Sequence, residues 1–304
     1  MTVTGPMPPE PTAGDVAPPR PTLGDYLSLV RFSHTVFALP FATLAAVMAW
    51  QVAPFRLMHA VGFVVCMVAA RTAAMAFNRL VDADIDAANE RTATREIPSG
   101  RMTRRQVGGL IAISCVAFFA GTACFLPNPW PLAVGPAVLA WLLGYSLAKR
   151  FTPLCHYWLG IALGLSPIAV WIGITATLSP SVLWLGAAIA LWVGGFDILY
   201  ACQDETFDRD AGLKSIPAWL GTTGAFWVAR VSHLLTVAVL AMFAVSADFG
   251  TIFFGGLGLI AAALLVEHVL ISPRDLKRVG LAFFQMNTLV SFGVLLFGTL
   301  DTLL

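Results

Sequence analysis

Residues 181–210 read SVLWLGAAIALWVGGFDILYACQDETFDRD and decide the class of fold. The first part is a continuous apolar run, long enough to cross about 30 Å of hydrocarbon as a helix. Acidic residues begin only where that run ends, and they continue in a polar segment: Asp197, Asp204, Glu205, Asp208 and Asp210. The stretch therefore predicts a membrane-spanning helix that passes directly into an acidic segment.

The rest of the chain has a similar composition. Hydrophobic residues make up 58% of the 304 residues and charged residues only 12%, with a mean hydropathy of +0.80. A soluble fold carries roughly 25% charged residues, so this chain has too little polar material to cover a water-facing globule. A net charge of +1 also argues against a nucleic-acid partner. The composition indicates a multi-span membrane protein that contacts the lipid bilayer.

Apolar segments of membrane-spanning length recur along the chain and predict an all-α fold of nine transmembrane helices around a central cavity. They are long continuous runs rather than ten-residue alternations, which argues against a β-barrel. The segments are 31–50, 57–80, 106–126, 131–148, 154–176, 181–203, 226–247, 250–271 and 280–300.

The distribution of Lys and Arg predicts the orientation. Loops after the even-numbered segments are rich in basic residues, whereas loops after the odd-numbered segments carry only Arg56. Because basic loops stay on the cytoplasmic side, the N-terminus is expected inside. Residues 1–24 are rich in proline without an apolar run and are expected to form a disordered cytoplasmic tail, and 25–304 the membrane domain.

Two acidic motifs lie where the second and sixth segments leave the membrane on the same side. Asn78, Asp82 and Asp86 are spaced i, i+4, i+8, so on a continuing helix they lie within roughly 80° of one another. In the second motif, Asp204 and Asp208 have the same spacing, with Asp197 on a similar face. Mg²⁺ takes oxygen ligands and shares them between carboxylates and substrate phosphates. Two facing motifs of this kind predict a magnesium site for a diphosphate.

A single loop aspartate would be interpreted as a solvated helix end, but two clusters on one face of the membrane favour a site. Asp84 and Asp210 are expected to point away from it, and the role of Glu205 is left open. Basic and amide side chains nearby are candidates for binding the diphosphate, although positive-inside topology alone also explains a loop Lys or Arg. These candidates are Arg71, Arg79, Lys149, Lys214 and Gln203.

The two motifs resemble those of the UbiA superfamily of intramembrane aromatic prenyltransferases. The chain carries Asn78-x3-Asp82-x3-Asp86 followed by RTATREIPSG, and Asp197-x2-Tyr200-x2-Gln203-Asp204-x3-Asp208 followed by GLKS. Further similarity lies in RFSHTVFALPFA (31–42) and YSLAKRFTPLCHYWLG (145–160), and the whole resemblance covers about 25–300. One departure is Arg79, where many members carry Asp. With the RFSHTVFALPFA opening, this pattern is most similar to 4-hydroxybenzoate polyprenyltransferases and the related futalosine-route menaquinone enzyme.

The resemblance implies transfer of a polyprenyl group from polyprenyl diphosphate to an aromatic acid, 4-hydroxybenzoate or a naphthoate, in ubiquinone or menaquinone biosynthesis. It implies Mg²⁺ as cofactor, no covalent nucleophile, and an inner (plasma) membrane enzyme whose site opens to the cytoplasm. Charge on the departing diphosphate would be stabilised by the metal. The expected ligands are Asn78, Asp82, Asp86, Asp197, Asp204 and Asp208.

The acid group of the acceptor needs a cation. Arg31 and His34 in the first segment are candidates, and Tyr145 and Tyr200 are candidates to assist through their hydroxyls. The four other histidines have no metal-ligand spacing and are given no role. They are His59, His156, His233 and His268.

Two other classes of protein remain open at this point. A membrane cation transporter also places carboxylates in helices, although it does so near the bilayer midplane. A membrane terpene cyclase would share the diphosphate site and need no acceptor.

Overall fold

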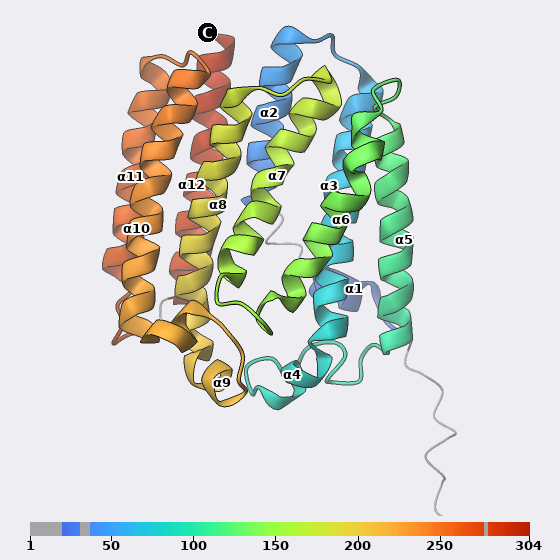
Figure 1. The fold of residues 1–304 in the computed structure, drawn as a ribbon, viewed down its shortest axis with the longest axis vertical. Coiled ribbons are helices and arrows are strands. Elements are labelled where there is room, and N and C mark those ends of the chain that lie inside the picture. Colours follow the sequence, from blue (N-terminus) through green and yellow to red (C-terminus); the bar gives the residue numbers. More distant parts are fainter. Residues whose placement is uncertain (1–19, 31–36, 277–278) are drawn as a thin grey trace, which may run out of the picture.

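The computed structural model describes residues 20–30, 37–276 and 279–304, except for the side chains of 281–283, and in these ranges it contains helices and no strand. Long helices run side by side in one bundle, and short helices α4 and α9 lie together at its lower end (Figure 1). The helices are α1 (Leu23–Val30), α2 (Leu39–Val52), α3 (Leu57–Val81), α4 (Ala83–Ala88), α5 (Arg104–Ala123), α6 (Trp130–Ala148), α7 (Cys155–Thr175), α8 (Pro180–Ala201), the 3₁₀ turn η2 (Cys202–Asp204), α9 (Glu205–Asp210), α10 (Ile216–Ser246), α11 (Thr251–Leu270) and α12 (Val279–Leu303).

Eight helices of the described ranges are long and apolar enough to cross a membrane. They correspond to the predicted segments from 57–80 onward. The first predicted segment, 31–50, overlaps α2, which has 14 residues and is about 21 Å long at 1.5 Å per residue. Residues 31–36 lie outside the described ranges. The count of nine spans and the orientation of the N-terminus therefore stay predictions.

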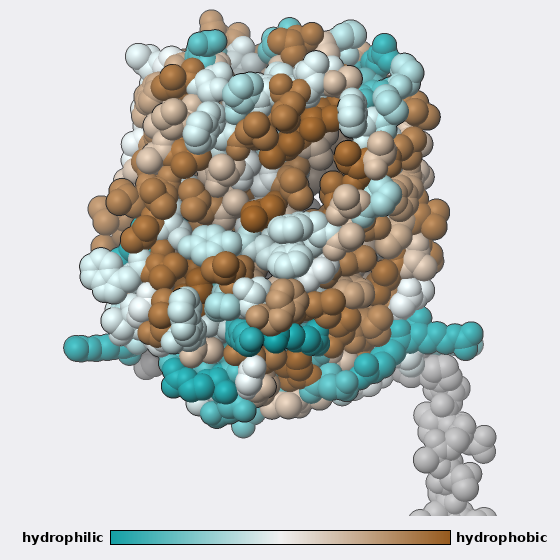
Figure 2. All heavy atoms as spheres, viewed as in Figure 1, coloured by the Kyte–Doolittle hydropathy of each residue, from teal (hydrophilic) through white to brown (hydrophobic). Residues whose placement is uncertain are grey.

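The outer surface of the bundle is apolar. Ile113, Val116, Leu234 and Val269 are each at least 70% exposed, and Figure 2 shows apolar residues over the body of the molecule and hydrophilic residues gathered at its lower end. An apolar surface of this extent is unfavourable in water, whereas helices that satisfy their own backbone hydrogen bonds are stable in lipid. The chain is an integral membrane protein.

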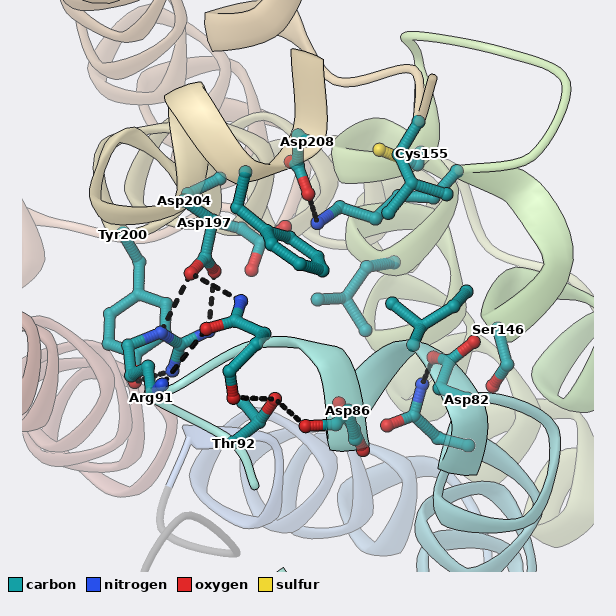
Figure 3. Close-up of a pocket in the computed structure, with 18 of the residues that line it drawn as sticks. Asp82, Asp86, Arg91, Thr92, Ser146, Cys155, Asp197, Tyr200, Asp204 and Asp208 are labelled. Carbon is teal, nitrogen blue, oxygen red and sulfur yellow. Dashed lines mark hydrogen bonds and ion pairs between the residues drawn. The ribbon is translucent and has the colours of Figure 1, made fainter. Parts of the chain in front are cut away.

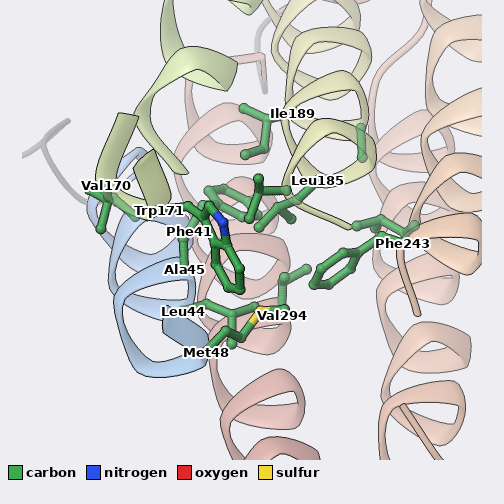
Figure 4. Close-up of a cluster of buried hydrophobic side chains, with 14 of the residues drawn as sticks. Phe41, Leu44, Ala45, Met48, Val170, Trp171, Leu185, Ile189, Phe243 and Val294 are labelled. Carbon is green, nitrogen blue, oxygen red and sulfur yellow. The ribbon is translucent and has the colours of Figure 1, made fainter. Parts of the chain in front are cut away.

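The largest buried cluster packs α2 against α7, α8, α10 and α12 (Figure 4). Phe41 of α2 and Trp192 of α8 lie edge to face, with ring centroids 5.3 Å apart. Between α7 and α8 the backbones touch: a Cβ placed on Gly186 would lie 2.7 Å from the carbonyl oxygen of Gly164. Close packing at small residues stabilises helix pairs in membranes. It holds α7 and α8, which carry His156 and Asp197, in a fixed relation.

Helix α10 begins ten residues earlier than the predicted 226–247, at Ile216. The Ser215 hydroxyl caps it by accepting a hydrogen bond from the Ala218 N–H. The helix then kinks at Gly221, whose φ of 70° suits glycine. Beyond the kink, Glu205 of α9 accepts hydrogen bonds from the backbone N–H and the hydroxyl of Thr222. The predicted start was wrong because this kinked, Gly- and Thr-containing turn lacks a continuous apolar run.

Candidate active site at the α4–α9 end

The first acidic motif lies across a break between two helices. Helix α3 ends at Val81, Asp82 has non-helical angles (φ −94°, ψ 5°), and α4 begins at Ala83. The Asn78 amide nitrogen donates to Asp82 Oδ2 at 2.8 Å. The expected continuing helix is therefore wrong, because the chain turns at Asp82, yet Asn78, Asp82 and Asp86 still line one cavity.

The second motif is also broken. Helix α8 ends at Ala201, the turn η2 ends at Asp204, and α9 carries Asp208. Asp197 lies inside α8, whereas Asp204 and Asp208 lie beyond its end. The turns at η2 and α9 bring these acids back over the end of the bundle, opposite α4.

The two motifs face the same cavity, which encloses about 200 Å³. Figure 3 shows Asp82 and Asp86 on one side of it and Asp197, Asp204 and Asp208 on the other. Asn89, just after α4, donates to Asp204 Oδ1 at 3.2 Å and joins the two sides directly. The structure thus brings together all six residues expected to bind the metal.

Four of the acids are paired with Arg or Lys side chains that also line the cavity. Two Arg come from the loop after α4, and Lys149 and Arg150 come from the loop after α6. The pairs are Asp86 with Arg95 at 2.6 Å, Asp208 with Lys149 at 2.8 Å, Asp82 with Arg150 at 2.9 Å, and Asp204 with Arg91, whose Nε donates to Oδ1 at 2.8 Å.

Burial and charge act against one another in these pairs. Burial raises the pKa of Asp82 above its ordinary value, Arg150 offsets this only in part, and Asp86 adds to the rise. Burial alone would lower the pKa of Lys149, but the ion pair with Asp208 outweighs it and raises that pKa. Because the Asp82 carboxylate is poorly solvated and has an acidic neighbour, a cation placed beside it would be strongly favoured.

Asp197 has a different partner. Its Oδ2 lies 2.7 Å from Nδ1 of His156, at the start of α7. The imidazole is almost fully buried, with 1% of its side chain exposed, whereas 27% of the Asp197 side chain is exposed to the cavity.

The residues expected to bind the diphosphate are separated by the structure. Lys149 lines the cavity, whereas Arg71, Arg79, Gln203 and Lys214 are not among its lining residues. Gln203 donates to the Tyr200 carbonyl at 3.0 Å, and Lys214 donates to the Phe151 carbonyl at 3.3 Å. Arg71 is deeper in α3, on the membrane side of Asn78.

Arg79 belongs to a buried ion pair. Its Nε lies 3.4 Å from Oε2 of Glu96, and the two side chains are 3% and 4% exposed. Glu96 also accepts a hydrogen bond from Ser28 of α1 at 2.6 Å. The Arg79 guanidinium also donates to Asn78 Oδ1 at 3.3 Å. It anchors the loop that carries Arg91 and Arg95.

Of the residues expected to bind the acceptor, Tyr145 and Tyr200 line the cavity. Tyr200 lies beneath the Arg91 guanidinium, whose central carbon is 5.6 Å from the ring centroid. Arg31 and His34 lie outside the described residues. Two other acids of these segments do not line the cavity. Asp84, which was expected to point away, is 87% exposed and forms an ion pair with Arg104. Glu205, whose role was left open, accepts hydrogen bonds from Thr222 at the kink of α10.

Sequence reasoning named Arg150 beside Lys149 as a candidate phosphate contact, counted Arg91 and Arg95 only as basic loop residues, and gave His156 no role. The available signal was position, because RTATREIPSG begins five residues after Asp86 and KRF begins four residues after Tyr145. Proximity to a motif does not reveal which cation meets which acid. That pairing depends on how the loops fold over the bundle.

The donor set suits a hard cation such as Mg²⁺, since it consists of carboxylate and amide oxygens from both sides of one cavity. Asp208 Oδ2 is buried and has no hydrogen-bond partner among the described residues. As the side chains stand, no three His, Cys, Asp or Glu of the described ranges converge as a ready metal site, because the acids turn toward Arg and Lys. The residues fit the metal once the acids are released from these cations.

The fold and the cavity define a class of protein: an integral membrane bundle with a polar, acid- and base-lined site at one end. The model of the UbiA prenyltransferase family matches residues 38–289, and the chain belongs to this family.

Several known proteins are similar to this chain. A protein of Aromatoleum aromaticum named 4-hydroxybenzoate octaprenyltransferase is 31% identical over 86% of this chain and 89% of its own length. The apo structure of a UbiA homolog from Aeropyrum pernix K1 is 33% identical with a TM-score of 0.77, covering 86% of this chain and 97% of that one. A UbiA homolog from Archaeoglobus fulgidus, bound to DMAPP and Mg²⁺, has the same fold at 21% identity and a TM-score of 0.64, covering 89% and 99%.

Proposed function

We propose that this protein transfers a polyprenyl group from its diphosphate to an aromatic acid, with Mg²⁺ as cofactor, in ubiquinone or menaquinone biosynthesis. The observation that carries the proposal is the cavity between α4 and α9, where acids of both motifs alternate with four Arg and Lys side chains. Separate groups for a metal and for phosphates are what a metal–diphosphate site needs.

The two kinds of side chain have separate proposed roles. The acids and Asn78 are the ligands for Mg²⁺, which when bound would neutralise charge that develops on the departing diphosphate. The basic residues that now hold these acids would turn to the phosphate oxygens. They are Arg91, Arg95, Lys149 and Arg150.

This exchange has a favourable electrostatic balance. Each buried acid gives up one cation and gains another, and each Arg or Lys gives up a carboxylate and gains a phosphate oxygen. No buried charge is left unpaired, which would be strongly destabilising. The ion pairs of the structure therefore preserve the site until both ligands arrive.

The remaining chemistry takes place on the membrane side of the phosphates. When the allylic C1–O bond breaks, the cation must be shielded from water, and the surrounding bundle provides an apolar wall. The acceptor ring carbon then forms a bond to C1 and loses its proton. Tyr145 and Tyr200 are proposed to contact the acceptor, and Arg31 and His34 remain the predicted partners of its carboxylate.

The relatives suggest the acceptor. The Aromatoleum aromaticum protein is named for 4-hydroxybenzoate and an octaprenyl group, so 4-hydroxybenzoate is the first proposed acceptor and a naphthoate the second. The Archaeoglobus fulgidus structure, bound to DMAPP and Mg²⁺, has the same fold. The basic loops at the α4–α9 end suggest that the cavity opens to the cytoplasm from the plasma membrane.

The test is a product assay with the full chain purified in detergent or nanodiscs. Prenyl diphosphates of several lengths and both acceptors are supplied with Mg²⁺, and products are identified by mass spectrometry alongside diphosphate release. We expect a prenylated aromatic acid, lost on chelation by EDTA and restored by Mg²⁺. Diphosphate release with a cyclised hydrocarbon would instead identify a terpene cyclase, and cation flux in proteoliposomes without diphosphate release would identify a transporter.

A further inference from the structure

A second cavity lies at the end of the bundle opposite the candidate active site. It encloses about 360 Å³, compared with about 200 Å³ for the cavity between α4 and α9. Its wall comes from three places at the upper end of Figure 1: the start of α3, the turn between α5 and α6, and the C-terminal end of α7. None of the described residues proposed for prenyl transfer lines it. A ligand bound here would therefore be separate from the reacting groups.

The charge of this cavity favours an anion. Arg56 directly precedes α3, lines the cavity and is exposed. Among the described residues, no side chain forms a hydrogen bond or ion pair with its guanidinium group. The described lining contains no Asp or Glu. A cation without a counter-ion at the mouth of a cavity is the electrostatic complement of an anionic ligand.

His59, one turn into α3, lines the same cavity with hydrogen-bonding capacity that the described residues do not use. It is 6% exposed, and its Nδ1 is buried without a hydrogen-bond partner. Its ring stacks on Phe125, with centroids 5.3 Å apart. Phe125 packs in turn on α7, because a Cβ placed on Gly173 would lie 2.9 Å from its ring. An imidazole carries at least one N–H, so this fixed ring is able to donate to a ligand.

The third polar residue of the lining, Asn128, is already occupied. Its amide nitrogen donates to the carbonyls of Ile172 and Gly173 at 2.7 and 2.9 Å. Its Oδ1 accepts from the Trp130 N–H at 3.1 Å. The start of α3, by contrast, has no side-chain cap, and the first N–H groups of a helix favour anions. The groups left for a ligand are therefore all on the α3 side of the cavity.

The surface beside the cavity is apolar. Phe55, Leu126 and Trp130 are 61%, 52% and 53% exposed, and each directly follows a lining residue in the sequence. Aromatic residues at the ends of spanning helices are typical of the membrane–water interface. A molecule that fits both the cavity and this surface has an anionic group joined to apolar chains.

We propose that this cavity binds an anionic phospholipid, whose phosphate accepts hydrogen bonds from Arg56 and His59 and whose acyl chains lie along the exposed apolar side chains beside it. The contact with Arg56 is a charge-assisted hydrogen bond, which is stronger than a neutral one. A zwitterionic lipid fits less well, because no Asp or Glu of the described lining meets its ammonium group. The inference does not depend on the proposed function.

The test measures lipid binding to the full chain in detergent by native mass spectrometry. The probe is phosphatidylglycerol, with phosphatidylcholine as the zwitterionic lipid and inorganic phosphate as a competitor without acyl chains. Arg56→Gln removes the charge and Arg56→Lys keeps it, while His59→Leu removes the second donor. Arg105→Gln is the matched control, because Arg105 is also exposed in the first turn of a spanning helix but is at the α4–α9 end and lines neither cavity.

We expect wild type to bind phosphatidylglycerol at least about fivefold more tightly than phosphatidylcholine. Arg56→Gln should weaken phosphatidylglycerol binding by about 5- to 10-fold and His59→Leu by about threefold. Arg56→Lys and Arg105→Gln should each stay within about twofold of wild type, and so should prenyl transfer by Arg56→Gln in detergent. Thermal unfolding identifies any variant that fails to fold, and the exposed Arg56 keeps the test valid if His59→Leu does so.

Three results would overturn the inference. Equal affinity of wild type for the two lipids would show that the cavity does not select an anionic headgroup. Displacement of phosphatidylglycerol by an equal concentration of inorganic phosphate would show that a free anion is sufficient. Equal losses in Arg56→Gln and Arg105→Gln would show a general attraction of the lipid to basic side chains. None of these results affects the proposed function, which the product assay tests separately.

Discussion

Two regions of this protein gather acids and bases inside a membrane bundle, and they differ in access and in pairing. In the cavity at the α4–α9 end, four acids pair with Arg or Lys, and the cationic side chains are between 18% and 35% exposed. The second region is a cluster of His233, Glu267 and His268 between α10 and α11. There the side chains of His233 and Glu267 are 3% and 2% exposed.

The polar side chains of the His233 cluster contact one another and one backbone carbonyl. His233 Nδ1 lies 3.0 Å from His268 Nε2 and 3.6 Å from Glu267 Oε2, and His233 Nε2 contacts the Trp192 carbonyl. Glu267 Oε2 has no hydrogen-bond partner among the described residues. Similar residue types thus form partly exposed ion pairs with Arg and Lys in the cavity, and a buried packing contact without Arg or Lys between α10 and α11.

The largest effect is expected in the cavity. Asp82→Asn and Asp204→Asn remove a charge from each side of the proposed metal site, so prenyl transfer at saturating Mg²⁺ should fall by about 10²- to 10³-fold. Initial rates of product formation measure this. Asp84→Asn is the matched control, because Asp84 is two residues from Asp82 but 87% exposed, and it should stay within about twofold of wild type. Full activity in either site variant would remove the assignment.

The buried ion pair of Arg79 and Glu96 lies beside the cavity but outside its lining. Substitutions in this pair test whether burial of a charge alone changes the free energy of unfolding. Arg79→Met removes the buried ion pair of Glu96, which keeps a longer contact with Arg101 at 3.7 Å, and Glu96→Gln removes the same ion pair from Arg79, which keeps its hydrogen bond to Asn78 Oδ1. Each should lower the free energy of unfolding by about 3 kcal/mol. The double variant should lose less than the sum of the two. Chemical unfolding in detergent measures both. Additive losses would show that the two side chains act independently.

The smallest effect is expected in the His233 cluster. Glu267→Gln keeps the shape of the side chain and replaces a buried carboxyl group that has no Arg or Lys partner among the described residues. Turnover should stay within about twofold and the free energy of unfolding within about 1 kcal/mol of wild type. A large loss of turnover with a normal unfolding profile would show that this cluster also takes part in the reaction.

Much of the fold was predictable because its signals are local. Eight of the nine predicted segments correspond to helices of membrane-spanning length, since the length of an apolar run reflects the thickness of the bilayer. The predicted start of α10 was wrong because Ser215, Gly221 and the Glu205 cap determine it. The breaks at Asp82 and at Cys202–Asp204 were missed for a similar reason, as apolar periodicity does not reveal where a helix turns.

The candidate site was predicted unevenly. The acids of both motifs line one cavity, because regular spacing within a motif keeps its residues on related faces. The cations were harder to predict. Lys149 lines the cavity, but Arg79 is directed to Glu96 and Lys214 to a backbone carbonyl. A long, flexible basic side chain reaches several partners, so its sequence position alone does not select one.

The order of residues was enough to predict that this chain crosses a membrane in many helices and that its two acidic motifs lie at one end of them. Both features follow from the order of residues along single helices. Only the tertiary structure decided that Arg91, Arg95, Lys149 and Arg150 each hold one acid, and that His156 holds Asp197. Those contacts join segments far apart in the chain, and they exist because close packing of α7 on α8 and folding of the α4 and α9 loops bring these segments together.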